Sequence, residues 1–341
     1  MMLKLKSFFA RVHDMNFKTM WMMISKINEE SGIPKAFIFV DMVFCALRYG
    51  VGYLEYRVFG WAYIRGKKRQ TFMKMQDNIE IYQRFNDKDF RYIFEDKIKF
   101  NEKFSEWVGR DFLDLRVSQL EDFENFCKEK KYIFAKETDG FGGVGARKID
   151  ISEFDSGEKL KKLYYELKLS HLYVVEECVV QCEKMNELCP SSINTIRMVT
   201  LLSKNGKPHL MYSLVRMGNG TKPVDNISSG GMYAPVDENG VIFKPAFCDK
   251  TGEIYEIHPF TKTRIVGFKI PFYNRAVEIV KEAALKVPQI GYVGWDVAMT
   301  DKGPILIEGN TLPGYDMPQN YYHLRDDKTG ILKKFKTVLE E

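Results

Sequence analysis

The stretch Gly294–Asn310, GWDVAMTDKGPILIEGN, holds two β-prone runs on either side of the turn residues Asp301-Lys302-Gly303. Two adjacent strands joined by that turn would place Asp296, Glu308 and Asn310 on one sheet face, because residues two apart in a strand point the same way. Three oxygen-bearing side chains suit Mg²⁺, which prefers hard oxygen ligands and also takes phosphate oxygens. The stretch therefore predicts a magnesium site. The alternative is an edge hairpin with solvent-facing carboxylates.

A glycine-rich segment, Asp139–Gly145, follows the β-prone run Tyr132–Lys136. Its glycines let backbone amides approach phosphate oxygens, and Lys136 adds a positive charge. The segment also satisfies G-x-G-x-x-G, but that dinucleotide fingerprint must open a helix, and residues 146–151 alternate as a strand does. We therefore expect a β-hairpin loop that cradles phosphate; the alternative is a flexible turn. The glycines of this predicted cradle are Gly140, Gly142, Gly143 and Gly145.

The periodicity of the sequence changes along the chain, with a boundary near Arg91. Residues 1 to about 90 repeat apolar positions at spacings of three and four, which predicts helices, whereas from about residue 130 short β-rich runs alternate with glycine turns. Helices are also expected after Ser156 and over Tyr273–Lys286. The expected strands are Lys131–Lys136, Ala146–Ile151, Leu172–Gln181, Thr195–Ser203, His209–Met217, Gly231–Ala234, Gly294–Met299 and Pro304–Glu308. The fold class is thus predicted to be α/β (α+β).

The composition is that of a folded protein with more than one core. A chain of 341 residues, 45% hydrophobic and 14% aromatic, is long enough for two or three subdomains. The six cysteines show no CxxC pair and no zinc spacing, so reduced thiols are expected. The first residues lack an apolar region that ends in a cleavage site, so we predict no signal peptide and a cytoplasmic location.

Positive charge is concentrated near the amino terminus. Residues 1–75 hold 13 Lys and Arg against 5 Asp and Glu, or +8, so the remaining residues carry −3 of the total of +5. Interleaved aromatic residues make this region a candidate for docking on anionic lipid or nucleic acid. The alternative is an amphipathic helical subdomain with a solvated basic face. Charged residues interrupt the apolar stretch Ala36–Ile64, so no membrane span is predicted.

Together these segments resemble the ATP-grasp superfamily. Asp96-Lys97 before a helix is similar to the first nucleotide lysine of that family, and Lys136 is similar to the second. Glu176-Glu177-Cys178-Val179 resembles the hinge, where an acidic residue lies near the adenine amino group and backbone atoms bond the base. Asp296, Glu308 and Asn310 match the metal ligands. The resemblance implies the ATP-grasp fold, with nucleotide and metal subdomains at residues 91–180 and 181–341 and an additional helical region at 1–90.

Other segments are similar to the sugar-transfer-associated ATP-grasp proteins, which are encoded with bacterial capsule and surface-polysaccharide enzymes. These segments are Ser192–Arg197, Arg216 with Asn226–Gly231, and the strand pair quoted above. The resemblance leaves the ribose contact open between Glu183 and Gln181. Because a guanidinium fork matches carboxylate and phosphate, Arg197 and Arg216 are candidate catalytic residues; each could instead pair with a structural acid. Asn194, Asn226 and Gly230 are candidate substrate or phosphate contacts.

The resemblance implies an ADP-forming carboxylate–amine ligase that uses ATP with one or two Mg²⁺ ions, or Mn²⁺, through an acyl phosphate. Its expected partners are a small carboxylic acid and an amine, the latter on a sugar or amino acid, in capsule or surface-polysaccharide synthesis. Peripheral contact with the inner membrane face or with glycosyltransferases is a further expectation, and nucleic acid is not expected. Two alternatives remain: an ATP-grasp kinase acting on a sugar or lipid-linked hydroxyl, and a non-catalytic nucleotide-binding partner of a glycosyltransferase.

Overall fold

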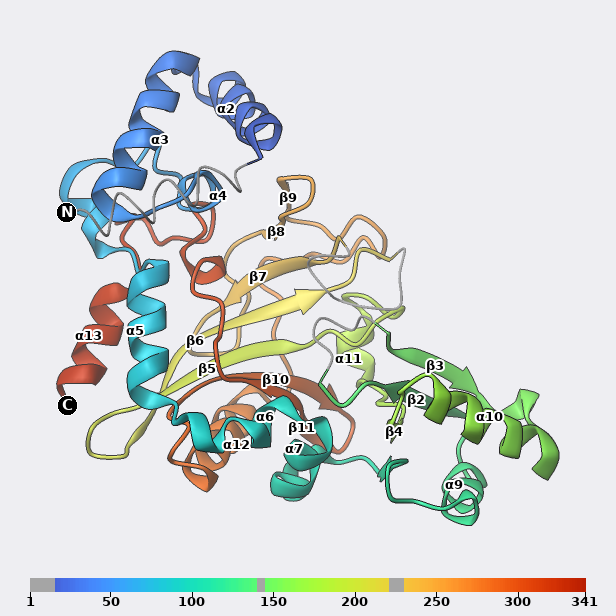
Figure 1. Cartoon of the computed structure of the whole chain (residues 1–341). Helices are drawn as coiled ribbons and strands as arrows, with labels where there is room; N and C mark the ends of the chain where they lie inside the picture. Colours follow the sequence, from blue (N-terminus) through green and yellow to red (C-terminus); the bar gives the residue numbers. More distant parts are fainter. Residues whose placement is uncertain (1–15, 140–144, 221–229) are drawn as a thin grey trace. The chain divides into compact units, whose positions relative to one another are not determined.

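The computed structural model describes residues 16–139, 145–220 and 230–341 (Figure 1). The chain forms two compact units. One contains residues up to Arg84 together with residues 203–205 and 314–341, and the other contains residues 85–202 and 206–313. This division differs from the predicted subdomains at the carboxy terminus, because residues 314–341 pack with the amino-terminal helices rather than with the metal-site strands.

The first unit is helical, as the periodicity predicts. Asn16 caps the first described helix by accepting a hydrogen bond from the Thr19 amide at 3.0 Å. Inside the unit, Asp41 accepts hydrogen bonds from Arg69 Nη1 at 2.9 Å and from the Tyr56 hydroxyl at 2.7 Å, which ties three segments together. The helices are α2 (Phe17–Ser31), α3 (Lys35–Tyr49), α4 (Tyr53–Val58), α5 (Met75–Phe85), α13 (Leu332–Glu340) and the 3-10 turns Gly66–Thr71 and Met317–Gln319.

The second unit contains a small antiparallel sheet in the order β1-β4-β2-β3. Residues 132–135 of β2 pair with residues 147–150 of β3, so the predicted hairpin on either side of the glycine-rich loop is confirmed. Helices α9 and α10 supply buried side chains to its core. The elements are β1 (Phe112–Asp114), α9 (Leu120–Cys127), β2 (Tyr132–Lys136), β3 (Arg147–Asp150), α10 (Gly157–Leu169) and β4 (Val174–Glu177).

The same unit contains a larger antiparallel sheet in the order β11-β10-β5-β6-β7-β8-β9. Helix α12 packs on it through Ala276, Val280 and Ala283, whose spacings of four and three place them on one helix face. The elements are β5 (Ile196–Leu202), β6 (Pro208–Met217), β7 (Met232–Val236), β8 (Ala246–Cys248), β9 (Glu253–Tyr255), α12 (Tyr273–Lys286), β10 (Tyr292–Thr300) and β11 (Gly303–Asn310).

Short helices connect the two sheets of the second unit. Phe94 of α6, Phe100 of α7 and Phe104 between α7 and α8 surround the buried ring of Trp295 on β10, and their ring centroids lie 5.3–6.4 Å from that of Trp295. The short helices are α6 (Tyr92–Glu95), α7 (Lys97–Lys103), α8 (Ser105–Val108), α11 (Glu183–Asn186) and the 3-10 turns Lys88–Phe90 and Ile151–Glu153.

The predicted strands are all present, with ends that differ by up to four residues. The prediction missed β1, β8 and β9, each three residues long, because a run of that length carries too little alternation to separate it from a turn. No helix in the described part of the chain is long and apolar enough to cross a membrane.

Candidate functional site

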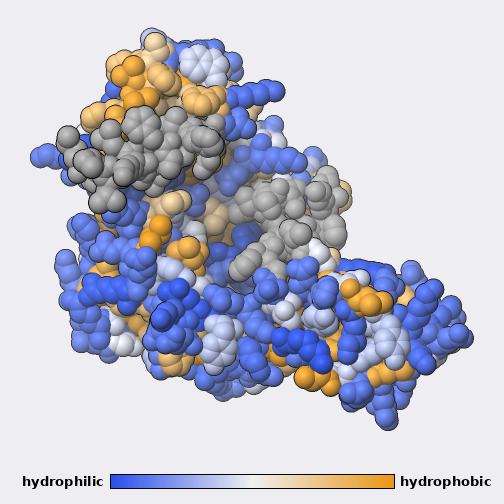
Figure 2. All heavy atoms as spheres, in the orientation of Figure 1, coloured by the Kyte–Doolittle hydropathy of each residue, from blue (hydrophilic) through white to orange (hydrophobic). Residues whose placement is uncertain are grey.

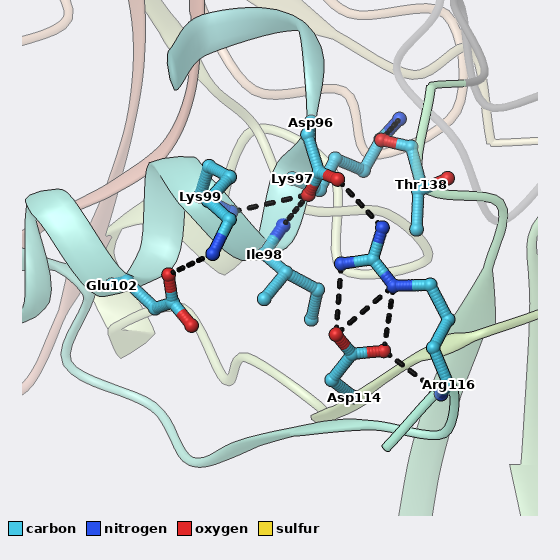
Figure 3. A network of polar contacts seen from close by, with 8 residues as sticks. All are labelled: Asp96, Lys97, Ile98, Lys99, Glu102, Asp114, Arg116 and Thr138. Carbon is cyan, nitrogen blue, oxygen red and sulfur yellow. Dashed lines mark hydrogen bonds and ion pairs between the residues drawn. The ribbon is translucent and has the colours of Figure 1, made fainter. Parts of the chain in front are cut away.

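The first predicted nucleotide lysine, Lys97, opens helix α7. Asp96 caps the helix by accepting hydrogen bonds from the amides of Ile98 and Lys99 at 2.8 and 3.1 Å. Arg116 donates to the other oxygen of Asp96 at 2.7 Å and is itself held by Asp114 of β1 (Figure 3). The Lys97 amide donates to the Thr138 carbonyl at 2.9 Å. These contacts place Lys97 beside the end of β2.

The second predicted lysine, Lys136, is the last residue of β2, and its Nζ lies 2.7 Å from Oε2 of Glu176 on β4. Glu176 is buried, and its other oxygen accepts hydrogen bonds from Asn101 Nδ2 at 2.7 Å and Arg110 Nη2 at 3.1 Å. Burial alone would raise the pKa of Glu176, but the adjacent Arg110 and Lys136 hold it well below its ordinary value. Glu176 is therefore an anion that orients Lys136.

Arg110 joins the two sheets of this unit and is not among the site residues predicted from the sequence. Besides Glu176, its guanidinium donates to the carbonyls of Leu306 at 2.8 Å and Ile307 at 3.1 Å on β11. Its side chain is only 3% exposed. Arg110 thus connects the strand that orients Lys136 to the backbone just before Glu308. Its sequence surroundings do not mark this role, because Glu176 and Leu306, the partners through which it joins the two sheets, lie 66 and 196 positions away.

The predicted metal ligands meet on the edge pair of the larger sheet. Asp296 on β10 is directly opposite Glu308 on β11, and Asn310 is opposite Gly294. Asn310 Nδ2 donates to Glu308 Oε1 at 3.3 Å. Gly309 separates the last two ligands, and a Cβ there would lie 2.7 Å from Phe94 and 2.9 Å from Phe100. Only glycine leaves room for that packing, which explains the residue between Glu308 and Asn310.

Both candidate arginines bind Asp296. Arg197 Nε and Nη2 lie 2.5 and 3.0 Å from its two oxygens, and Arg216 Nη2 donates to Oδ2 at 3.1 Å. Burial alone would raise the pKa of Asp296, but the two guanidinium groups lower it to about 2. Arg216 Nε also donates to Thr195 Oγ1 at 3.2 Å. From the sequence, each arginine could bind substrate or pair with an acid; in the structure both Arg197 and Arg216 pair with Asp296.

The donor set at Asp296 and Glu308 suits a divalent cation. Burial and the neighbouring Asp296 carboxylate raise the pKa of Glu308, because two carboxyl groups in contact favour a proton between them. A cation would satisfy the same charge with oxygen ligands from Asp296, Glu308 and Asn310. In the described ranges no three His, Cys, Asp or Glu side chains cluster as metal ligands, so this candidate site has two carboxylates and the amide of Asn310.

Charges from both the cationic and the acidic parts of the site act on the pKa of Lys97. Its pKa is lowered by burial and then by the positive charge of Lys136, while Glu308, Asp139 and Glu176 act in the opposite direction. The two lysines and the Glu308 carboxylate therefore interact within one region of the unit. A polyanion bound there would relieve the repulsion between the lysines.

The structure separates the two candidates for the ribose contact. Gln181 is buried, and its Nε2 donates to Asn186 Oδ1, the Cys189 carbonyl and the Ser192 carbonyl at 2.9–3.0 Å. Its Oε1 accepts hydrogen bonds from the amide and the side chain of Asn194 at 2.8 and 3.0 Å. The side chains of Gln181 and Asn194 thus form a buried hydrogen-bond network that holds residues 181–194 in place. Glu183, at the start of α11, is exposed.

Other predicted site residues fall into three groups. Of the predicted hinge residues, Glu176 and Glu177 end β4, and Cys178 and Val179 are half-buried after it. Glu177 is exposed, whereas Glu176 is buried and paired with Lys136. Gly145 and Gly230 have positive φ angles of 78° and 97°, which favour glycine. The remaining members lie outside the described residues, so their positions are not described: Gly140, Gly142, Gly143 and Asn226.

Comparison with solved structures finds matches at low sequence identity. The biotin carboxylase domain of the Hydrogenobacter thermophilus 2-oxoglutarate carboxylase, in complex with MgADP, ADP and bicarbonate, matches at 15% identity and a TM-score of 0.41, over 66% of this chain and 41% of that one. The ATP-grasp ligase PsnB, in complex with a precursor variant, Mg and ADP, matches at 11% identity and a TM-score of 0.40, over 68% of this chain and 54% of that one. The D-alanine-D-alanine ligase of Coxiella burnetii matches at 11% identity and a TM-score of 0.37, over 65% of this chain and 49% of that one.

The matched region thus spans about half the length of these proteins or less. A comparison with curated proteins finds no match. A family model described as sugar-transfer associated ATP-grasp matches residues 133–324, more than half of the chain and including every described candidate residue except Lys97. The chain therefore belongs to the sugar-transfer associated ATP-grasp family and has the ATP-grasp fold.

Proposed function

We propose that this protein is an Mg-ATP-dependent carboxylate–amine ligase that forms ADP and acts in the assembly of a surface polysaccharide. The observation that carries the proposal is the meeting of Lys97 and Lys136 with Asp296, Glu308 and Asn310 in one unit, from strands and helices far apart in sequence. Cationic side chains beside an oxygen-donor cluster are what a bound nucleoside triphosphate with its metal requires. The family description supports an association with sugar transfer, and the surface-polysaccharide context is what the resemblance of the sequence implies.

In this proposal the lysines and the acidic residues of the site bind different parts of a metal-bound polyphosphate. Lys97 and Lys136 would neutralise phosphate oxygens, and Glu176 keeps Lys136 aimed at them by a 2.7 Å ion pair. Asp296, Glu308 and Asn310 would hold Mg²⁺, which supplies charge neutralisation at the phosphates when bound. Arg197 fixes the orientation of Asp296 through two contacts. Arg216, which is half-buried beside the same carboxylate, is placed to bind the substrate carboxylate or the transferring phosphoryl group.

The proposed reaction has two steps. A carboxylate oxygen attacks the γ-phosphorus of ATP, the bond to the β,γ-bridging oxygen breaks, and ADP leaves an acyl phosphate behind. An amine nitrogen then attacks the acyl carbon, the tetrahedral intermediate expels inorganic phosphate, and the amine proton is lost to solvent. Positive side chains around the phosphates are needed before an anionic carboxylate can approach them.

Assays of ADP and phosphate release over panels of carboxylic acids, each with and without amines, test this proposal. A ligase releases ADP and phosphate in equal amounts only when acid and amine are both present, and hydroxylamine traps the acyl phosphate as a hydroxamate. ADP release with a sugar hydroxyl and no free phosphate would identify the kinase alternative. ATP binding with no turnover on any panel would favour the non-catalytic nucleotide-binding partner.

Mg-ATP is expected to raise the thermal unfolding temperature of the wild-type chain by about 2 °C or more. At about 100 times its dissociation constant a ligand adds roughly 2.7 kcal/mol to the stability of the state that binds it. The shift should shrink with a chelator and in Asn310→Ala, which removes one proposed metal ligand without unpairing a charge. Equal shifts with and without Mg²⁺, or a shift with NAD instead of ATP, would contradict the assignment.

Glu183→Ala is expected to weaken ATP binding by about tenfold, the loss of one charge-assisted hydrogen bond, with little effect on folding. Gln181→Ala should instead destabilise the fold by at least about 2 kcal/mol, because it leaves several buried donors and acceptors without partners. Titration calorimetry and urea unfolding of both variants separate the two effects. The assignment of the ribose contact to Glu183 fails if its variant binds ATP as the wild type does.

A further inference from the structure

The outward side of helix α3 is apolar from Ala36 to Leu47. Every exposed residue between Ala36 and Leu47 is apolar, including Phe37 (50% exposed), Val40 (64%), Phe44 (51%) and Leu47 (54%). Spacings of three, four and three residues place these last four on one face of the helix. A solvent-facing helix side in a soluble protein normally carries charged and polar residues instead.

The neighbouring helices α2 and α4 also carry exposed apolar side chains. On α2, Trp21 is 50% exposed, with its ring centroid 6.3 Å from that of Phe39 on α3, and Phe17 is 56% exposed. On α4, Leu54 is 53% exposed. The space-filling view shows hydrophobic side chains gathered over α2 and α3 (Figure 2). We call the face formed by Phe17, Trp21, Phe37, Phe39, Val40, Phe44, Leu47 and Leu54 the α2–α4 face.

The fold of the helical unit does not need this face. The opposite side of α3 supplies the buried core residues Ile38, Met42 and Cys45. The lone acid of the helix, Asp41, is satisfied by Arg69 and Tyr56. Contiguous exposed apolar surface beyond that requirement marks an interaction site.

Positive charges flank the α2–α4 face. Lys35 and Arg48, both exposed, lie at opposite ends of α3, about 20 Å apart for 13 residues of helix. The Arg65 guanidinium lies 4.8 Å from the centroid of the Phe37 ring. Residues 16–70 contain nine Lys and Arg against four Asp and Glu, and one of those acids, Asp41, is neutralised internally by Arg69.

We propose that the α2–α4 face docks on an anionic lipid bilayer, with α3 lying in the plane of the interface. Apolar and aromatic side chains would enter the headgroup boundary while Lys35, Arg48 and Arg65 pair with lipid phosphates. The contact is peripheral, because a helix of 15 residues spans about 22 Å, less than the roughly 30 Å hydrocarbon core. A second copy of the chain is a poorer partner, since two surfaces of the same positive charge repel.

Sedimentation of the full-length chain with lipid vesicles tests the proposal. The wild type should bind vesicles that contain phosphatidylglycerol at least about tenfold more strongly than vesicles of phosphatidylcholine alone. Phe44→Ser with Leu47→Ser should lower binding to the anionic vesicles by at least about tenfold. The matched control is Leu169→Ser on α10, which is 81% exposed outside the α2–α4 face and should leave binding unchanged. Circular dichroism and the Mg-ATP thermal shift of each variant establish that the fold and the nucleotide site are intact.

A second variant, Lys35→Glu with Arg48→Glu, separates the charge contribution from the apolar one. It should abolish the preference for anionic lipid while leaving weak binding to neutral vesicles. The proposal is overturned if both double variants bind as the wild type does, or if only removal of residues 1–15 abolishes binding. It is equally overturned if the wild type ignores vesicles and Phe44→Ser with Leu47→Ser instead dissociates a dimer in analytical ultracentrifugation.

Discussion

Glu308→Gln is expected to lower the rate of ATP-dependent turnover by about 10²–10³-fold, the size of effect seen when one preorganised electrostatic contribution to a transition state is removed. The substitution keeps the shape of the side chain and removes the charge that a metal ion requires. Little stability should be lost, because burial and Asp296 already raise the pKa of Glu308 and so favour its neutral form in the metal-free protein. The unfolding temperature should therefore stay within about 2 °C of the wild type.

The measurement is ADP release at saturating ATP, with Glu121→Gln as the control. Glu121 lies on α9 and is exposed, so its loss of one carboxylate tests for a general effect of charge. An Mg²⁺ titration adds a readout of the metal itself, since Glu308→Gln should need more Mg²⁺ for the same ATP-induced thermal shift. Wild-type turnover in Glu308→Gln would remove Glu308 from the proposed metal site.

Glu176→Gln is expected to destabilise the second unit by about 3–5 kcal/mol, the cost of leaving a buried ion pair with one partner. Its carboxylate is the shared partner of Lys136, Arg110 and Asn101, and its side chain is 5% exposed. The amide of glutamine cannot neutralise two buried cations. Urea unfolding at pH 7 measures the loss, and any correctly folded fraction should also bind ATP more weakly because Lys136 is no longer oriented.

The control is the next residue, Glu177→Gln. Glu177 is exposed and accepts one hydrogen bond, from the Asp111 amide at 3.3 Å, so its replacement should cost less than about 1 kcal/mol. The pH dependence gives a second test. Because the folded pKa of Glu176 is depressed, its contribution is fully present above its unfolded pKa of about 4.3 and is lost as pH falls toward the folded value. The stability gap between wild type and Glu176→Gln should therefore narrow below about pH 4, and a gap independent of pH would contradict the ionic role.

The elements that the sequence predicted well are those specified by short-range patterns. The strands that flank the glycine-rich loop, the hairpin of β10 and β11, and helix α12 each carry a periodicity or a turn that neighbouring residues determine by themselves. The same reasoning places Glu308 and Asn310 two apart on a strand opposite Asp296. These local rules, together with the family resemblance, were enough to predict the fold class.

The sequence could not assign partners to the polar residues of the site. It left Arg197 open between substrate and structural acid, because the acid that Arg197 meets lies far away in the chain. It left Gln181 open as a ribose contact, because the partners of Gln181 lie in irregular backbone whose path no periodicity predicts. The structure commits Arg197 to Asp296, 99 positions away, and commits Gln181 to an internal network. Burial then makes those commitments costly to break.

By itself, then, the sequence determined the strands of four or more residues, helices α10 and α12, and the spacing of the Asp296, Glu308 and Asn310 donors, because each depends on contacts within a few residues. Tertiary structure alone decided that Arg110 joins Glu176 to the backbone before Glu308, and that residues 314–341 pack with the amino-terminal helices. It also decided which apolar residues of α3 are left outside the core. Periodicity gives the direction of a side chain around its own element, but only long-range packing determines what that side chain meets.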